Sequence, residues 1–187
     1  MTAHATISWS GGIEVTERVR FDDRMGWMED ELRSGSLAPR IATAVDAATL
    51  AGLLHDFNVE FGEPSPGPEV LARRLGRLLF ADSTLAQLAG DPPAGFVLLT
   101  LRSNVWYDTP VALLDELYVV PSMRGRGIGS ALLESGCSLV RTRGVELMEI
   151  NVDGEDRDAR RFYERHGFSC VHSDRPEPEL YYSREFS

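Results

Sequence analysis

The stretch that decides the fold is Arg124-Gly125-Arg126-Gly127-Ile128-Gly129-Ser130. It follows the apolar run from Val111 to Val120 and precedes Ala131-Leu132-Leu133, so it joins a predicted buried strand to a predicted helix. Glycines let the backbone approach a ligand closely, and the N–H groups at a helix N-terminus converge on an anion. The stretch therefore predicts a phosphate site, with Arg124 and Arg126 adding positive charge nearby.

Two other phosphate-binding loops do not match this spacing. A Walker loop contains Gly-Lys followed by Ser or Thr, and the chain has no lysine. A dinucleotide loop has the form Gly-x-Gly-x-x-Gly, and its third glycine, read from Gly125, would fall on Ser130. No suitable acidic residue follows about 20 residues later. Both nucleotide-binding folds are therefore excluded.

Arg124, Gly127 and Gly129 form an Arg-x-x-Gly-x-Gly signature, preceded by Leu117-Tyr118-Val119-Val120-Pro121. This signature resembles the coenzyme A loop of the GNAT superfamily of N-acetyltransferases. The loop alone would also fit a tight helix entry. A second stretch, from Ala159 to Phe168, is similar to an AxxFYExxGF pattern found downstream in that superfamily, which strengthens the resemblance.

The resemblance implies an α/β fold with a mixed central sheet of six to seven strands and helices on both faces. Hydrophobic periodicity from about residue 40 to 185 agrees with this fold. The predicted order is β-α-α-β-β-β-α-β-α-β-β. Strands are predicted over 41–45, 84–88, 95–101, 111–120 and 145–152, with two more from Phe168 onward. Helices are predicted after the N-cap Asp46, from Pro68, up to about Arg143, and over 156–166.

The acetyltransferase domain is predicted to occupy residues 39–187, and residues 1–38 form an N-terminal extension. Alternation of apolar and charged residues near Ile13 to Phe21 is typical of a strand, and Met25, Met28 and Leu32 indicate a short helix. An added lid, a dimer arm and a poorly ordered tail all remain open for this extension.

The resemblance also assigns residues to acetyl-coenzyme A. In the family, the loop backbone holds the pyrophosphate of coenzyme A, which here means Arg124 to Ser130. The end of the preceding strand pairs with the pantetheine arm, which implies Leu117, Tyr118 and Val119. Many relatives have an asparagine seven residues before the conserved tyrosine. This chain has Asp156 there, which puts that cofactor contact in doubt, and helix N-capping explains Asp156 as well.

Tyr163 is the predicted general acid. The resemblance places it at the family's general-acid tyrosine. A phenol is a neutral proton donor at pH 7 that can protonate the departing thiolate of coenzyme A. Ala159, Phe162, Tyr163 and His166 also share one helix face, so Tyr163 could instead be a packed aromatic residue. None of the four histidines gains a catalytic role from the sequence.

Asp115 and Glu116 are the candidates for the base that accepts the amine proton. In a regular strand they would point to opposite faces, and a bulge would upset that assignment. The string Leu-Asp-Glu-Leu-Tyr-Val resembles the diamine acetyltransferase branch, which slightly favours Asp115 as base or amine anchor, with Glu116 second. Asn151 lies where relatives often place a polar residue near the reaction centre, and it could orient substrate or water.

The composition limits the classes of partner and substrate that the chain is expected to bind. The formal net charge of −10 disfavours nucleic acid and weakly favours a small cationic amine. No metal spacing appears, no apolar run is long enough to cross a bilayer, and no secretory signal precedes the domain, so we expect a cytoplasmic protein without a metal. Trp106-Tyr107 could wall an amine pocket or anchor a loop. A homodimer is one expectation, because dimers are common in the superfamily.

Three functions compete at this point. The leading hypothesis is a small-amine N-acetyltransferase. The same core could serve a protein N-acetyltransferase, because substrate choice does not follow from the fold. A non-catalytic acyl-coenzyme A-binding module would need the loop but not Tyr163.

Overall fold

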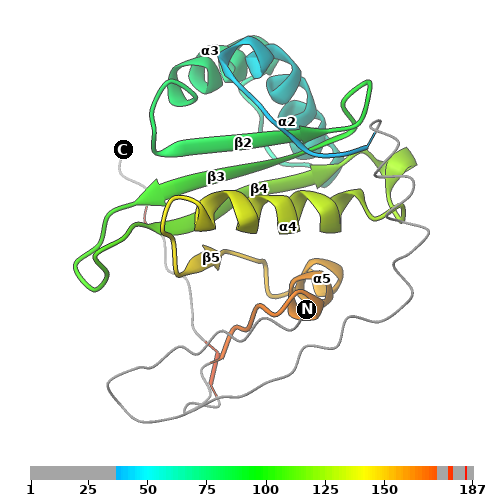
Figure 1. Cartoon of the computed structure of the whole chain (residues 1–187). Coiled ribbons are helices and arrows are strands. Elements are labelled where there is room, and N and C mark those ends of the chain that lie inside the picture. The colour runs from blue at the N-terminus through cyan, green and yellow to red at the C-terminus, as the bar shows by residue number, and fades with distance from the viewer. Residues whose placement is uncertain (1–36, 172–176, 179–183, 185–187) are drawn as a thin grey trace.

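The computed structural model describes residues 37–171, 177–178 and 184. The predicted extension 1–38 lies almost entirely outside the described residues, as does most of the segment in which two C-terminal strands were expected. The described part contains one five-stranded sheet between two layers of helices (Figure 1). The α/β class and the helices on both faces are confirmed.

The strands lie in the sheet in the same order as in the sequence. They are β1 Arg40–Ile41, β2 Thr84–Ala89, β3 Gly95–Arg102, β4 Val111–Val119 and β5 Met148–Ile150. The first four run antiparallel to their neighbours, and β5 runs parallel to β4, so the sheet is mixed as predicted. The prediction of six to seven strands is wrong for the described residues, which contain five; residues 168–171 form no strand.

Two strands are shorter than the hydrophobic pattern predicted. Strand β1 ends at Ile41 because Asp46 turns the chain: its carboxylate accepts a hydrogen bond from the backbone N–H of Thr43 at 2.9 Å, and residues 44–46 form a 3-10 helix. Strand β5 is limited to Met148–Ile150, because its pairing with β4 stops at Leu114. The carbonyl oxygen of Leu147, directly before β5, still accepts a hydrogen bond from the N–H of Ala112 in β4 at 3.0 Å, and the polar Asn151 follows β5.

The four α-helices among the described residues occupy the predicted places. They are α2 Ala47–Phe61, α3 Pro68–Leu78, α4 Ile128–Arg141 and α5 Arg157–Arg165. Helix α2 ends at Gly62, which has a left-handed backbone with φ of 72°, and α3 begins with Pro68 in its first turn, where no N–H is needed. These short-range signals explain why the helix positions were predictable.

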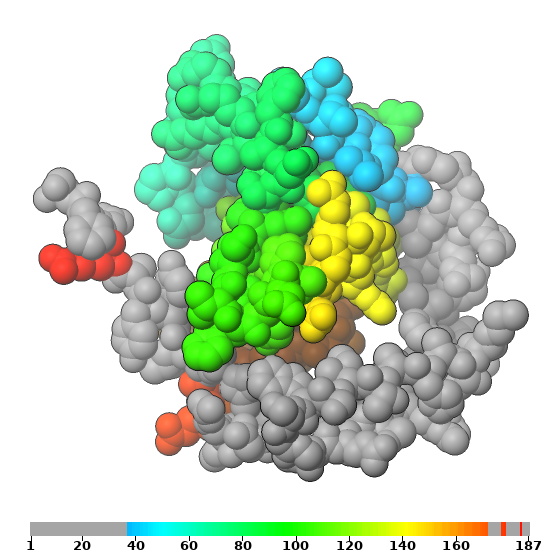
Figure 2. Space-filling model, turned by 60° about the vertical axis from the view of Figure 1, so that its left-hand side comes forward, coloured from blue at the N-terminus to red at the C-terminus, as the bar shows by residue number. Residues whose placement is uncertain are grey.

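The core consists of two apolar clusters, one on each face of the sheet. Helices α2 and α3 cover the face that carries Phe96, Leu98 and Tyr118. Helix α4 covers the opposite face, and α5 packs beside it through Phe162 and Tyr163 (Figure 1). The end of β4 and the start of α4 therefore meet at one edge of a rigid sheet. In Figure 2 the turn between β3 and β4, in bright green, forms part of the molecular surface at the other end of these strands.

Candidate active site

The site begins where β5 separates from β4. The two parallel strands pair only from Ala112 to Leu114 of β4. Directly after Leu114 the ladder between β3 and β4 shifts: Leu99 pairs with Leu114 but Leu98 pairs with Glu116, which leaves Asp115 as an extra residue. A β-bulge of this kind bends its strand and redirects the side chains that follow. The last residues of β4 therefore have a paired edge toward β3 and an open edge toward the gap.

The open edge of β4 presents backbone hydrogen-bonding groups. The N–H of Val120 donates to the carbonyl oxygen of Ala94 at 2.9 Å, so Val120 faces β3. Backbone groups alternate in direction along a strand, and those of Leu117 and Val119 therefore face the gap. The Val119 carbonyl already accepts from Nε of Arg124 at 2.9 Å. An extended amide-containing chain could pair with what remains of this edge.

The glycine loop closes one end of the gap. Gly125 and Gly127 have φ of 74° and 77°, a left-handed conformation that glycine adopts without strain. Helix α4 begins directly after them, at Ile128. Within the described part of the chain, the N–H groups from Gly127 to Ser130 have no hydrogen-bond acceptor. Together with the positive end of the helix dipole, these donors form an anion site.

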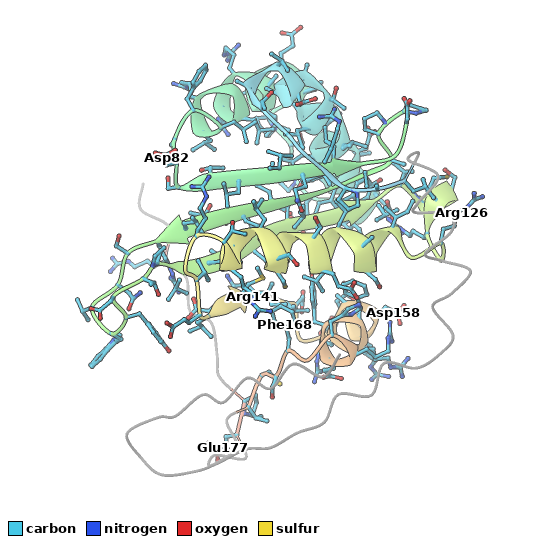
Figure 3. All side chains as sticks on the ribbon, viewed as in Figure 1. Asp82, Arg126, Arg141, Asp158, Phe168 and Glu177 are labelled. Atoms are coloured by element: carbon cyan, nitrogen blue, oxygen red, sulfur yellow. The ribbon has the colours of Figure 1, made fainter. Side chains whose placement is uncertain are left out.

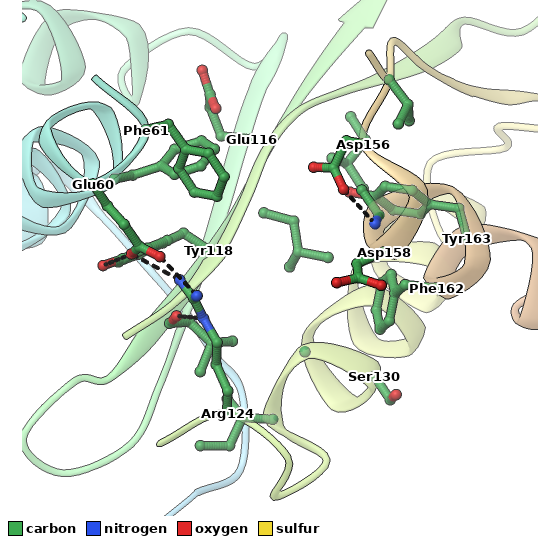
Figure 4. Close-up of a pocket in the computed structure, with 18 of the residues that line it drawn as sticks. Glu60, Phe61, Glu116, Tyr118, Arg124, Ser130, Asp156, Asp158, Phe162 and Tyr163 are labelled. Atoms are coloured by element: carbon green, nitrogen blue, oxygen red, sulfur yellow. Dashed lines mark hydrogen bonds and ion pairs between the residues drawn. The ribbon is translucent and has the colours of Figure 1, made fainter. Parts of the chain in front are cut away.

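A cavity of about 890 Å³ connects these features. Its walls come from α2, the end of β4, the glycine loop, the start of α4, the segment after β5, and α5. Figure 4 shows Glu60, Phe61 and Glu116 on one wall and Asp156, Asp158 and Tyr163 on the opposite wall. The cavity brings together every predicted site residue except Arg126: Asp115, Glu116, Leu117, Tyr118, Val119, Arg124, Gly125, Gly127, Ile128, Gly129, Ser130, Asn151, Asp156 and Tyr163.

The two arginines of the loop differ from the prediction that both add charge for a phosphate. Arg126 is exposed and points outward from the tip of the loop (Figure 3), and it does not line the cavity. Arg124 lines the cavity, but its guanidinium is paired with Glu60 of α2 at 2.7 Å. Anion binding at this loop therefore depends mainly on backbone N–H groups.

Asp115 and Glu116 line the same cavity, although an undisturbed strand would have turned them to opposite faces. The bulge at Asp115 is the reason. Glu116 pairs with Leu98 and so shares the face of the sheet that α2 covers, whereas regular alternation from Leu114 would have turned it toward α4. The carboxylate of Asp115 accepts a hydrogen bond from the hydroxyl of Thr100 at 2.6 Å.

The two carboxyl groups differ in their ionisation. Burial, with a smaller contribution from the negative charge of Asp115, raises the pKa of Glu116 to about 7. Burial also raises the pKa of Asp115, while its hydrogen bond from Thr100 lowers it. A carboxyl group with a pKa near 7 can exchange protons at physiological pH, which is the property of a general base.

Tyr163 lies at the end of the second turn of α5, with its ring against Phe162 and Phe168 at centroid distances of 5.2 and 5.8 Å. Burial raises the pKa of its phenol to about 12, and the charges of Glu116 and Asp156 contribute in the same direction. The phenol therefore stays protonated across the physiological range. It is a packed aromatic residue that also lines the cavity, and its role as general acid stays a prediction.

Asp156 is the N-cap of α5, as the sequence predicted: its carboxylate accepts from the N–H of Ala159 at 2.9 Å. Asn151 follows β5 directly and lines the cavity. Trp106 and Tyr107 do not line it. Trp106 is 85% exposed in the turn between β3 and β4, and the side chain of Asn104 accepts hydrogen bonds from both backbone N–H groups. The pocket-wall interpretation of this pair is wrong for this cavity, and Asn104 holds the turn through backbone N–H groups and not through the two aromatic rings.

Sequence reasoning did not assign the part of α2 that reaches this site. Phe57, Glu60 and Phe61 line the cavity from that helix. His166 bridges two helices: its Nδ1 lies 2.7 Å from the carbonyl oxygen of Phe162, and its Nε2 lies 3.0 Å from the hydroxyl of Ser130. Its position at the end of the second conserved stretch was the only signal.

Neither a metal site nor a membrane span occurs in the described part of the chain. No three His, Cys, Asp or Glu side chains there are grouped so that they could hold an ion. No helix there is both long and apolar enough to cross a membrane.

Comparison with known proteins decides the family. A model of the acetyltransferase (GNAT) family matches residues 50–168, more than half of the chain. The chain belongs to the acetyltransferase (GNAT) family. The match runs from α2 to the end of the second conserved stretch, so this GNAT chain carries both motifs from which the resemblance was inferred.

Solved and curated proteins agree with this membership. A protein from Arthrobacter sp. FB24, provisionally described as an acetyltransferase, is 58% identical to the GNAT chain, with a TM-score of 0.76 over 80% of this chain and 96% of that one. A mycothiol acetyltransferase from Beutenbergia cavernae is 37% identical over 55% of this chain and 34% of that protein. An aminoalkylphosphonate N-acetyltransferase from Salmonella typhimurium is 36% identical over 42% of this chain and 51% of that protein. This GNAT chain thus spans about a third to a half of these curated relatives.

Proposed function

We propose that this GNAT chain transfers the acetyl group of acetyl-coenzyme A to the primary amine of a small cationic molecule. The observation that carries the proposal is the cavity in which an anion-binding loop, an open strand edge, a carboxyl group with a pKa of about 7 and a protonated phenol converge. Each of these parts is needed for the transfer, and their joint occurrence favours an enzyme over a binding module.

The residues present suit acetyl-coenzyme A. The N–H groups from Gly127 to Ser130 would bind its pyrophosphate, and the backbone of Leu117 and Val119 would pair with its pantetheine arm. When bound, the cofactor supplies an acetyl group activated as a thioester. A pantetheine arm along β4 would direct the thioester toward the part of the cavity that Glu116 and Tyr163 line.

Charge and shape at the other end support a cationic acceptor. Asp115 and Glu116 bring carboxyl groups to this part of the cavity, and Phe57 and Phe61 add aromatic surface. An ammonium group gains from both kinds of neighbour, through attraction to carboxylates and to the faces of aromatic rings. The curated relatives are named for mycothiol and aminoalkylphosphonates, so their acceptors are small molecules, but a phosphonate would meet these acids unfavourably.

The side chains divide the proton transfers between them. The acceptor attacks as the neutral amine: its lone pair bonds to the thioester carbonyl carbon, and Glu116 takes the proton that the nitrogen loses. As the new C–N bond forms and the C–S bond breaks, Tyr163 donates its phenolic proton to the departing sulfur. The proton held on Glu116 balances the one lost from Tyr163, so the net products are an acetamide and a free thiol. Asn151 would orient the acceptor or a water molecule.

Thiol release with a panel of acceptors tests the proposal. The panel contains diamines, aminoglycosides, an aminoalkylphosphonate and a peptide with a free N-terminus. We expect the parent chain to release thiol with cationic small amines, and Tyr163→Phe to lower kcat by about 10²- to 10⁴-fold, because the phenylalanine ring packs alike but donates no proton. Unchanged coenzyme A affinity in this variant is the control.

The other functions remain as outcomes of the same experiment. Turnover with the peptide alone would identify a protein N-acetyltransferase. A chain that binds acetyl-coenzyme A but releases no thiol with any acceptor would be a binding module, and the enzymatic proposal would be wrong.

A further inference from the structure

Glu60 and Arg124 form a two-pronged ion pair across the mouth of the cavity. Nη1 of Arg124 donates to Oε1 of Glu60 at 2.7 Å, and Nη2 donates to Oε2 at 2.8 Å (Figure 4). A guanidinium and a carboxylate match in this geometry, which is stronger and more directional than a single contact. Glu60 lies in the last turn of α2, 64 residues before Arg124 in the sequence.

The remaining contacts of Arg124 also point into the protein. Its Nε donates to the carbonyl oxygen of Val119 at 2.9 Å, and its guanidinium carbon lies 5.6 Å from the ring centroid of Tyr118. The hydroxyl of Tyr118 donates to Oε2 of Glu60 at 3.2 Å. A phosphate ligand of Arg124 would have to compete with Glu60 for both prongs. The signature arginine is therefore engaged by its own chain.

This cluster joins the two halves of the cavity. Tyr118 and Val119 belong to the end of β4, and Arg124 precedes the first glycine of the loop. On the other side, the ring of Phe57 contacts those of Tyr118 and Phe61, each at a centroid distance of 5.2 Å. The end of α2, which supplies the aromatic wall of the acceptor side, is thus tied to the loop on the cofactor side.

We propose that Glu60 is a positioning residue that holds the glycine loop in its anion-binding form through Arg124, and that Arg124 is a structural tie and not a ligand of the coenzyme A phosphates. The inference rests on the proposed function only for the identity of the ligand. Glu60 would thus contribute to cofactor binding although it lies on α2, far from the glycine loop in the sequence.

For the Glu60→Gln variant, the proposal and electrostatic repulsion alone predict opposite changes in the affinity for coenzyme A. Removing a carboxylate near an anion site lowers the electrostatic repulsion, and it would also free Arg124 to bind phosphate. Both effects would make coenzyme A bind more tightly to Glu60→Gln. If Glu60 instead positions the loop, the same substitution releases the loop and binding becomes weaker.

Calorimetric titration of the full chain with coenzyme A shows whether the Kd rises or falls in the variant. Glu60→Gln keeps the length of the side chain and an oxygen that can accept from Tyr118, but it loses one prong and the charge. We expect Kd to rise about three- to tenfold, since the pair is partly exposed, with 28% of the Glu60 side chain accessible. Glu63→Gln, an exposed carboxylate outside the cavity lining, removes the same charge and should leave Kd unchanged. An unchanged or lower Kd in Glu60→Gln would overturn the proposal.

A second set of variants tests whether the two residues act as one unit. Arg124→Lys keeps the charge but not the fork, so it should weaken binding as much as Arg124→Gln does. The double variant Glu60→Gln/Arg124→Gln should bind about as weakly as either single variant, because one tie is lost in each. Additive losses, or full rescue by lysine, would identify Arg124 as an independent phosphate ligand and contradict the proposal. A parent chain that fails to bind coenzyme A would overturn the proposed function itself, whereas a wrong sign in Glu60→Gln removes only this inference.

Discussion

Glu116 combines two properties that usually exclude each other in a carboxyl group. It is buried enough for its pKa to rise to about 7, yet it lines an open cavity where an acceptor could reach it. The charge of Asp115 beside it contributes to that rise, and Glu116 in turn helps to raise the pKa of Tyr163 to about 12. The base and the acid of the proposed mechanism would therefore keep their required protonation states over a wide pH range above neutrality.

The first prediction concerns the pH profile. With an acceptor amine that titrates well above neutrality, the slope of log kcat/KM against pH should fall by one near pH 7, where Glu116 becomes ionised. In Glu116→Gln this break should disappear and kcat should fall about 10²- to 10³-fold. Steady-state kinetics from pH 5 to pH 9 would show it. A break retained in Glu116→Gln and lost in Asp115→Asn would assign the base to Asp115.

Thermal unfolding of the same variant supplies a second readout. Because the folded-state pKa of Glu116 is raised, the native state binds more protons than the unfolded state between about pH 4.5 and pH 7, and stability falls as pH rises through that range. Glu116→Gln should therefore raise Tm at pH 8 relative to the parent and change it little at pH 4. A variant that is less stable at pH 8 would show that the ionised carboxylate is not penalised by burial.

Among the helices and strands, features set by local residues could be predicted from the sequence, whereas features set by long-range contacts could not. Helix α3 begins at Pro68 and the glycine loop precedes α4, because proline and glycine restrict or free the backbone where they stand. The bulge at Asp115 has no local signature, so parity could not choose between Asp115 and Glu116. The partnership of Glu60 with Arg124 depends on how α2 lies over β4, which no spacing records.

The glycine loop gives a prediction about coenzyme A affinity. Gly127→Glu places bulk and negative charge among the donors from Gly127 to Ser130, so coenzyme A should bind more than about 100-fold more weakly, equivalent to the loss of two charge-assisted hydrogen bonds. Gly62→Glu is the matched control: Gly62 has a similar φ of 72° and open space around it, but it lies outside the cavity lining. Equal affinities in the two folded variants, measured by calorimetry, would exclude the loop as the phosphate site.

For the whole molecule, the net charge of −10 acts differently on the two substrates. A cationic acceptor is attracted by the overall field and by the carboxylates at its end of the cavity, so that field helps it to approach. An anionic cofactor is repelled at long range and must gain its affinity from short-range donors. The backbone N–H groups at the start of α4 provide such donors without any lysine in the chain.

The last prediction follows from this asymmetry. Raising the ionic strength from about 0.01 M to about 0.15 M shortens the screening length from about 30 Å to about 8 Å. KM for a diamine should then rise about three- to tenfold at saturating acetyl-coenzyme A, while Kd for coenzyme A should stay constant or fall. Steady-state kinetics and calorimetry at several salt concentrations would measure both. A diamine KM that does not change with salt would argue against acceptor selection by charge.

The open edge of β4 has a consequence for how such a protein can diversify. The groups that Leu117 and Val119 turn toward the gap belong to the peptide backbone, which every residue type supplies. Side chains along this strand can therefore be exchanged to suit a new acceptor while the edge stays the same. Loss of pairing along this edge would require an insertion, a deletion or a proline in β4, because only these change the main chain of the strand. An evolving lineage could thus alter its substrate by single point mutations and keep its acetyl donor.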